Sequence, residues 1–165
     1  MGDIEIIVPY YPGIIPGRKQ AGRDHMYRKI LVAYDGSEGA LKALDAGINL
    51  AKIHQAQLSL LAVQEHLPKF AGTIDEMEEE KAFADEQYGR LLEAARAKAQ
   101  EQGVTLETLL RPGHPAKTIV QVAKEGGFDL VLVGHTGLSG VWAAFLGTTA
   151  EKVSRHAPCS VLIVR

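Results

Sequence analysis

The chain has 165 residues, 46% of them hydrophobic and 23% charged, and its formal net charge at pH 7 is −2. This is the length and composition of one globular domain that can bury a core without disulfides or structural metal, and the charge excludes a sequence-independent grip on nucleic acid. No apolar run approaches the roughly 20 residues of a membrane helix. The only cysteine is Cys159, and no secretory signal opens the chain. We therefore expect a cytoplasmic protein that binds neither nucleic acid nor membranes.

The first 25 residues differ from the rest, because three prolines interrupt short apolar pieces and no periodic pattern survives. The dipeptide His25-Met26 is typical of a cloning scar before a natural start. We therefore treat 1–25 as an N-terminal extension that cloning can introduce, and 26–165 as the domain. The alternative is a native extension in which Ile4–Val8 pairs with the edge of a sheet.

Short apolar runs alternate with helical patterns from Tyr27 onward. The expected strands are Ile30–Tyr34, Gln57–Gln64, Val104–Leu110, Asp129–Val133 and Ser160–Val164. The expected helices run from Ser37 to about His54, from Asp75 to about Gly103, from Pro115 to about Gly126 and from Thr148 to about His156. This alternation predicts right-handed βαβ units with parallel strands.

Local signals mark the ends of these helices. Ser37 can cap the first helix, and Pro115 suits the first turn of the third. Thr148 and Glu151 have the spacing of a capping box at the start of the last helix. The acidic run 75–86 opens the long second helix, where a solvated helix start explains it better than a binding tail does.

The fold class predicted from this order is α/β, with one doubly wound five-stranded parallel sheet, strand order 3-2-1-4-5, and helices on both faces. In such sheets ligands bind beyond the carboxyl ends of the strands, where the winding reverses. That point lies between the first and fourth strands, so Asp35 and Gly134 are expected to meet there. The last strand, Ser160–Val164, is expected at the sheet edge.

A glycine-rich stretch follows the fourth strand, with Gly134, Gly137 and Gly147-Thr148 in the pattern G-x2-G-x9-G-T. Glycines let the backbone approach a phosphate closely, and a helix start adds N–H donors, so the pattern predicts a phosphate-binding loop. The alternative is a plain connecting loop. The Walker pattern and a G-x-G-x-x-G after the first strand are absent.

From Met26 to Arg165 the chain resembles the universal stress protein family, whose fold is that of the adenine nucleotide alpha hydrolase-like proteins. The matching residues are Lys29–Ser37, Gly113–Ala116 with Ile119, Asp129–Gly134, and Gly147–Val153 continuing through His156–Val164. The glycine pattern is similar to that of the subgroup that binds ATP. The resemblance therefore implies an adenine nucleotide, ATP or its products ADP and AMP, with or without Mg²⁺.

The resemblance also implies which residues border the nucleotide. They are Ala33, Tyr34, Asp35, Val63, Val133, Gly134, Gly137, Gly147, Thr148 and Thr149. Three of them have structural alternatives: Asp35 can bond its own turn, Val63 can be core packing, and Thr148 can be a helix cap.

The spacer Leu138–Leu146 holds no lysine or arginine, so phosphate charge must be met by backbone N–H groups, the helix dipole and a metal ion. Trp142 and Phe145 in the same spacer can pack a partner or a lid, or belong to the core. We assign no catalytic residue. His135 is expected to point to solvent or to bond a carbonyl, and the histidines show no metal-ligand spacing.

We therefore predict a stress-response protein that acts as a nucleotide-dependent binding module. The resemblance implies a homodimer in which two C-terminal strands pair antiparallel across a two-fold axis, and a protein partner is a further expectation. One alternative is a dimeric interaction protein with a vestigial pocket. The other is a slow ATP hydrolase in which Asp35 and His135 help to cut a phosphate bond.

Overall fold

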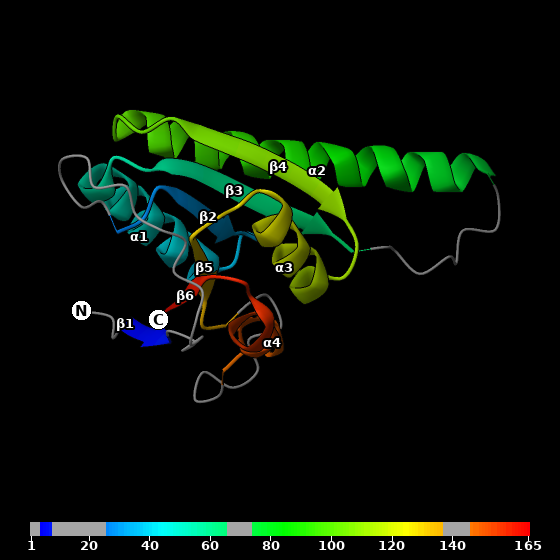
Figure 1. Ribbon diagram of the computed structural model, residues 1–165. Helices are drawn as coiled ribbons and strands as arrows, with labels where there is room; N and C mark the ends of the chain where they lie inside the picture. Colours follow the sequence, from blue (N-terminus) through cyan, green and yellow to red (C-terminus); the bar gives the residue numbers. More distant parts are fainter. Residues whose placement is uncertain (1–3, 8–25, 66–73, 137–145) are drawn as a thin grey trace.

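Figure 1 shows the computed structural model, which describes residues 4–7, 26–65, 74–136 and 146–165. The strands are β1 (Ile4–Ile7), β2 (Lys29–Ala33), β3 (Gln57–Gln64), β4 (Leu106–Pro112), β5 (Leu130–Gly134) and β6 (Ser160–Val164). The helices are α1 (Glu38–His54), α2 (Ile74–Glu101), α3 (Pro115–Glu125) and α4 (Thr148–His156). Within the described residues the strands form one sheet, in the order β1-β6-β5-β2-β3-β4.

The strands from β2 to β6 are parallel, and their order β4-β3-β2-β5-β6 is the predicted order 3-2-1-4-5. The fold prediction is therefore confirmed. Adjacent residues of the central strands are buried on opposite faces, as Leu31 and Val32 show, which is why these strands read as unbroken apolar runs. Two helices cover each face: α1 and α2 pack on one, α3 and α4 on the other.

The start of α1 agrees with the cap predicted from the sequence, whereas the start of α4 differs from its predicted capping box. The Ser37 side chain accepts a hydrogen bond from Ala40 N at 3.2 Å, so the predicted cap of α1 is confirmed. The predicted capping box of α4 is wrong, because Gly147 is the cap residue and Thr148 is already the first residue inside the helix. From that position a side chain does not reach the N–H groups that a cap residue bonds. Thr148 therefore has no capping role.

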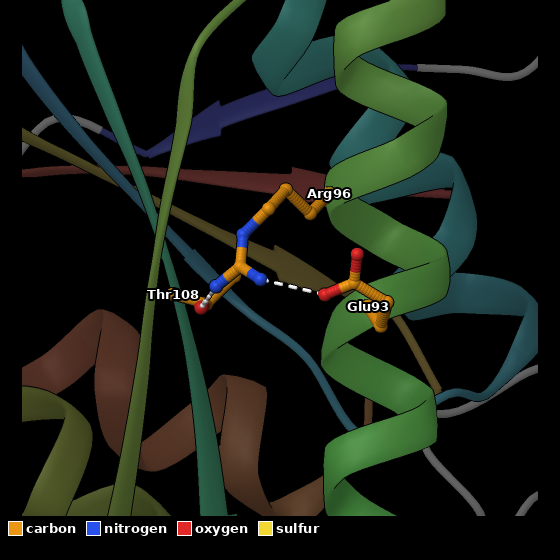
Figure 2. Close-up of polar contacts among 3 residues, drawn as sticks. All are labelled: Glu93, Arg96 and Thr108. Atoms are coloured by element: carbon orange, nitrogen blue, oxygen red, sulfur yellow. Dashed lines mark hydrogen bonds and ion pairs between the residues drawn. The ribbon is translucent and has the colours of Figure 1, made fainter.

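Helix α2 is fixed to its neighbours by polar contacts as well as by its apolar side. Figure 2 shows Arg96 between Glu93 of the same helix, at 2.6 Å, and Thr108 of β4, at 2.5 Å. Lys98 forms an ion pair with Asp45 of α1 at 2.9 Å. Because these groups are partly exposed, each contact adds little stability alone, and the pairs serve to hold α2 in register on β4 and α1.

Helix α2 is longer than the strands that it covers. Its 28 residues span about 42 Å, whereas the eight residues of β3 span about 26 Å. Figure 1 shows its first turns extending past the carboxyl ends of the strands. Although α2 has the length of a membrane span, no helix in the described ranges is apolar enough to cross a bilayer.

The C-terminal strand does not lie at the sheet edge. β1 pairs with it antiparallel, with Ile4 opposite Val164 and Ile7 opposite Val161 (Figure 1). The predicted edge position of Ser160–Val164 is therefore wrong, and the pairing alternative for Ile4–Val8 agrees with the structure over its described residues, Ile4–Ile7. The physical reason is that β6 is buried and apolar, and its outer N–H and C=O groups would otherwise lack partners.

Candidate functional site

A cavity of about 390 Å³ lies at the carboxyl ends of β2, β3 and β5, beside the start of α4. The site residues predicted from the sequence that line it are Ala33, Tyr34, Asp35, Val63, Val133, Gly134, Gly147, Thr148 and Thr149. The remaining predicted residue, Gly137, lies outside the described residues, as do Trp142 and Phe145. The structure therefore brings the end of β2 and the start of α4 to one cavity, although more than 100 residues of sequence separate them.

Several lining residues were not predicted as site residues. They include Ser37, Leu61, Glu65, Tyr88, Pro115, Ile119 and Thr136. Glu65 directly follows β3, so the rule that selected Asp35 after β2 could also have selected it. The helical periodicity of the sequence places Tyr88 on the buried side of the long helix and indicates no role at a site. Nothing local in the sequence reveals that this turn of α2 reaches the ends of the strands.

Asp35 lies in the turn between β2 and α1. Its Oδ1 accepts a hydrogen bond from Ser37 N at 3.0 Å, which is the turn contact considered as the structural alternative. The same residue also lines the cavity, so the two interpretations are compatible. Next to it, Tyr34 N donates to Leu61 O at 2.9 Å and extends the parallel ladder by one residue. Burial, followed by the carboxylates of Asp35 and Asp45, raises the pKa of the Tyr34 phenol.

Gly134 has a packing role that the sequence did not reveal. A Cβ atom there would lie 2.5 Å from the carbonyl carbon of Gly39 and 2.9 Å from Ala40 N, in the first turn of α1. Neither glycine adopts the left-handed conformation, since Gly134 is not among the residues with positive φ and Gly147 has a φ of −59°. The first turn of α1 therefore demands a glycine at 134 whether or not a ligand is bound.

The start of α4 is anchored through His135. His135 N donates to Val164 O at 2.7 Å, and Gly147 N donates to His135 O at 2.8 Å. The His135 side chain is buried, so the first of its two predicted alternatives, a side chain that points to solvent, is wrong. His135 is not among the described residues that line the cavity. The N–H groups in the first turn of a helix have no partner within the helix, and Thr148 and Thr149 bring that turn to the cavity.

The opposite side of the cavity carries carboxylates and a phenol. Tyr88 of α2 is half-buried, and its hydroxyl donates to Val63 O at 3.2 Å. Burial, followed by the charges of Glu65 and Asp35, raises the pKa of this phenol. The cavity is therefore polarised, with anionic groups near the ends of β2 and β3 and the positive end of the helix dipole at α4.

The described residues offer little support for binding a phosphate through cationic side chains or for holding a metal ion through a cluster of protein ligands. Among the described residues that line the cavity there is no lysine, arginine or histidine. The part of the chain that the structure describes holds no cluster of three or more histidine, cysteine, aspartate or glutamate side chains suited to a metal ion.

Comparison with known proteins decides the family. The universal stress protein family matches the chain over residues 26–165. The chain belongs to this family. It is 41% identical over 148 residues to the universal stress protein YxiE of Bacillus subtilis, a match that covers 85% of this chain and 100% of that protein. It is 35% identical over 144 residues to a universal stress protein of Thermus aquaticus, with 85% and 100% covered.

Solved structures support the same assignment. The universal stress protein UspA from Lactobacillus plantarum superposes with a TM-score of 0.74 at 31% identity, covering 84% of this chain and 98% of that one. A universal stress protein solved in complex with cAMP superposes with a TM-score of 0.62 at 27% identity, covering 84% and 97%. The resemblance inferred from the sequence motifs is therefore confirmed at the level of family and fold.

Proposed function

We propose that the cavity binds an adenine nucleotide and that this universal stress protein is a nucleotide-dependent binding module of the cytoplasmic stress response. The observation that carries the proposal is the polarity of the cavity, with Asp35 at one side and the first turn of α4 at the other. A volume of about 390 Å³ lies in the range typical of small-molecule sites. The related protein in complex with cAMP supports an adenine nucleotide as the ligand.

The two sides of the cavity suit the two ends of a nucleotide. A carboxylate such as Asp35 accepts hydrogen bonds from ribose hydroxyls or a base amino group, and Ala33, Val63 and Val133 supply apolar walls for a purine. The helix start at Gly147–Thr149 attracts the phosphates. Mg²⁺ would come with ATP, and the Thr148 and Thr149 hydroxyls are oxygen ligands of the kind that it accepts.

The residues that line the cavity argue against fast ATP hydrolysis. Phosphoryl transfer needs a cationic clamp and a group that orients the attacking oxygen. The described lining has no cationic side chain, and the sequence of 137–145 contains none either. We therefore propose that ATP hydrolysis, where it occurs, is slow, and that the hydrolase pairing of Asp35 with the buried His135 is not used.

The experiment that tests the proposal identifies small molecules released from the purified protein by denaturation, using mass spectrometry. AMP, ADP or ATP at a near-equal ratio to protein is the expected result. Calorimetric titration with each nucleotide, with and without Mg²⁺, then ranks them. If the protein releases no nucleotide and binds none of the three, the proposal fails. The alternative function, a dimeric interaction protein with a vestigial pocket, would then be favoured.

We also propose that the protein forms a homodimer through antiparallel pairing of two β6 edges. β6 is apolar and buried, and such an edge pairs readily with a second copy of itself across a two-fold axis. β1 covers this edge in the same chain, so the two pairings are mutually exclusive. Dimerisation by this route requires β1 to dissociate from β6.

Deletion of residues 1–25 is therefore expected to strengthen self-association by at least tenfold, because it removes β1 and exposes the backbone of β6. Sedimentation velocity of the full chain and of the deletion variant, over a range of concentrations, measures this change. A deletion variant that stays monomeric at micromolar concentration would contradict the dimer.

A proline in β6 of the deletion variant is the control for this experiment. Val164 O accepts from His135 N and so faces β5, and the alternation along a strand then directs the N–H of Val161 to the outer edge. Val161→Pro removes that donor and blocks edge pairing, so the gain in self-association should be lost. Circular dichroism checks that this variant keeps its fold.

A further inference from the structure

The side of the cavity away from α4 carries a group whose role the proposed function leaves open. Tyr88 comes from α2, whereas the other residues that we assigned to the nucleotide come from strand ends, the β2–α1 turn and the start of α4. Its hydroxyl lies 3.2 Å from Val63 O, near the carboxyl end of β3. Figure 1 shows that α2 itself continues past the carboxyl ends of the strands. The inference that follows rests on the proposed function, and it concerns which base the cavity accepts.

The hydrogen bond of Tyr88 fixes what its hydroxyl can offer a ligand. A phenol has one proton to donate and lone pairs to accept. The proton is directed to Val63 O at 3.2 Å, so the lone pairs of the oxygen remain for a second partner. Toward a ligand, Tyr88 is therefore a hydrogen-bond acceptor.

The neighbours of Tyr88 have the same character. Glu65 follows the end of β3, and Asp35 follows the end of β2, and both line the cavity. An ionised carboxylate accepts hydrogen bonds and donates none. Burial, followed by the charges of these two carboxylates, raises the pKa of the Tyr88 phenol, so the hydroxyl keeps its proton at neutral pH. This side of the cavity thus presents acceptors, which favour a ligand group that carries N–H donors.

We propose that Tyr88 is a specificity-determining residue that selects a base with an exocyclic amino group, the group that distinguishes adenine from the unsubstituted purine. An amino group donates to the Tyr88 oxygen and is favoured by the surrounding carboxylates. A base with hydrogen at that position offers the Tyr88 oxygen no such donor once water has been displaced, which weakens binding.

The test compares AMP with purine riboside 5′-monophosphate, which lacks only the amino group, by calorimetric titration. We expect the full-length protein to bind AMP about tenfold more tightly than the analogue. In Tyr88→Phe, which keeps the ring and removes the hydroxyl, the preference should fall below about threefold. The ratio of the two affinities is insensitive to any change that weakens both ligands equally.

Tyr27→Phe is the matched control, because it removes a phenol hydroxyl at the amino end of β2, where the ring of Tyr27 packs edge-on against His54 at 5.4 Å. It should keep the wild-type ratio. A preference that persists or grows in Tyr88→Phe would overturn the assignment of Tyr88, as would equal affinities in the wild type. If neither ligand binds the wild-type protein, it is the proposed function that fails.

Discussion

Replacing Gly147 with glutamate is expected to weaken AMP binding by at least a factor of about one hundred, because it places a carboxylate at the start of α4, where the phosphate should bind. Like charges at this short range cost several kcal/mol, which is more than the helix dipole supplies. The backbone at Gly147 has φ −59° and ψ 144°, a conformation open to any residue, so the fold should survive. Calorimetric titration measures the affinity, and far-ultraviolet circular dichroism checks the helices.

Gly147→Ser is the control for this substitution. Serine is a favoured cap residue, adds no charge and suits the same backbone conformation. We expect it to bind AMP within about threefold of the wild type. Wild-type affinity in Gly147→Glu would place the phosphate elsewhere and remove the main support for the proposed site.

Gly134→Ala is expected to destabilise the protein by about 2 to 3 kcal/mol, although it adds only one methyl group. The new Cβ would lie 2.5 Å from Gly39 C and 2.8 Å from Gly39 O, which are backbone atoms that no side-chain rotation can move. α1 would have to shift away from the end of β5. Urea denaturation followed by circular dichroism measures the free energy of unfolding.

Gly89→Ala is the control in the same assay, because at this position we expect alanine to increase the free energy of unfolding. Gly89 lies within α2 and nothing lies within 4 Å of the position that its Cβ would take. Alanine there should stabilise the protein by roughly 0.5 to 1 kcal/mol, since it favours the helix. Equal stabilities of Gly134→Ala and the wild type would show that the close approach of α1 to β5 is not required.

Local patterns predicted much of the fold because most of its elements are marked by neighbouring residues. Gln57–Gln64 and Ser160–Val164 have the predicted bounds, since buried parallel strands read as apolar runs that end at polar or turn residues. The Ser37 cap was predictable for the same reason, as the contact spans three residues. The alternation and the handedness of the crossovers indicate a parallel sheet covered on both faces. The predicted order 3-2-1-4-5 rests on the known orders of doubly wound sheets, because handedness alone allows more than one.

Features that depend on distant contacts were not predictable in this way. The sequence shows Gly134 as a glycine near a strand end, but the need for it comes from Gly39, 95 positions earlier. Tyr88 reads as one more residue on the buried side of a helix, and only the packing of α2 brings it to Val63. The pairing of β1 could be offered only as an alternative, because 1–25 shows no periodic pattern and the partner, the open backbone of β6, lies more than 150 positions away.

The pairing of β1 with β6 has a consequence for how the protein would respond to its own abundance. Because β1 belongs to the same chain, its effective concentration at the β6 edge is on the order of millimolar, far above that of a second molecule at micromolar levels. A dimer through β6 needs two cleared edges, so the fraction of uncovered molecules enters its association constant as a square. A strand that covered its edge about nine-tenths of the time would weaken dimerisation about a hundredfold. Because of this squared dependence, a modest change in the fraction of molecules in which β1 covers β6 would change the association constant of the dimer strongly.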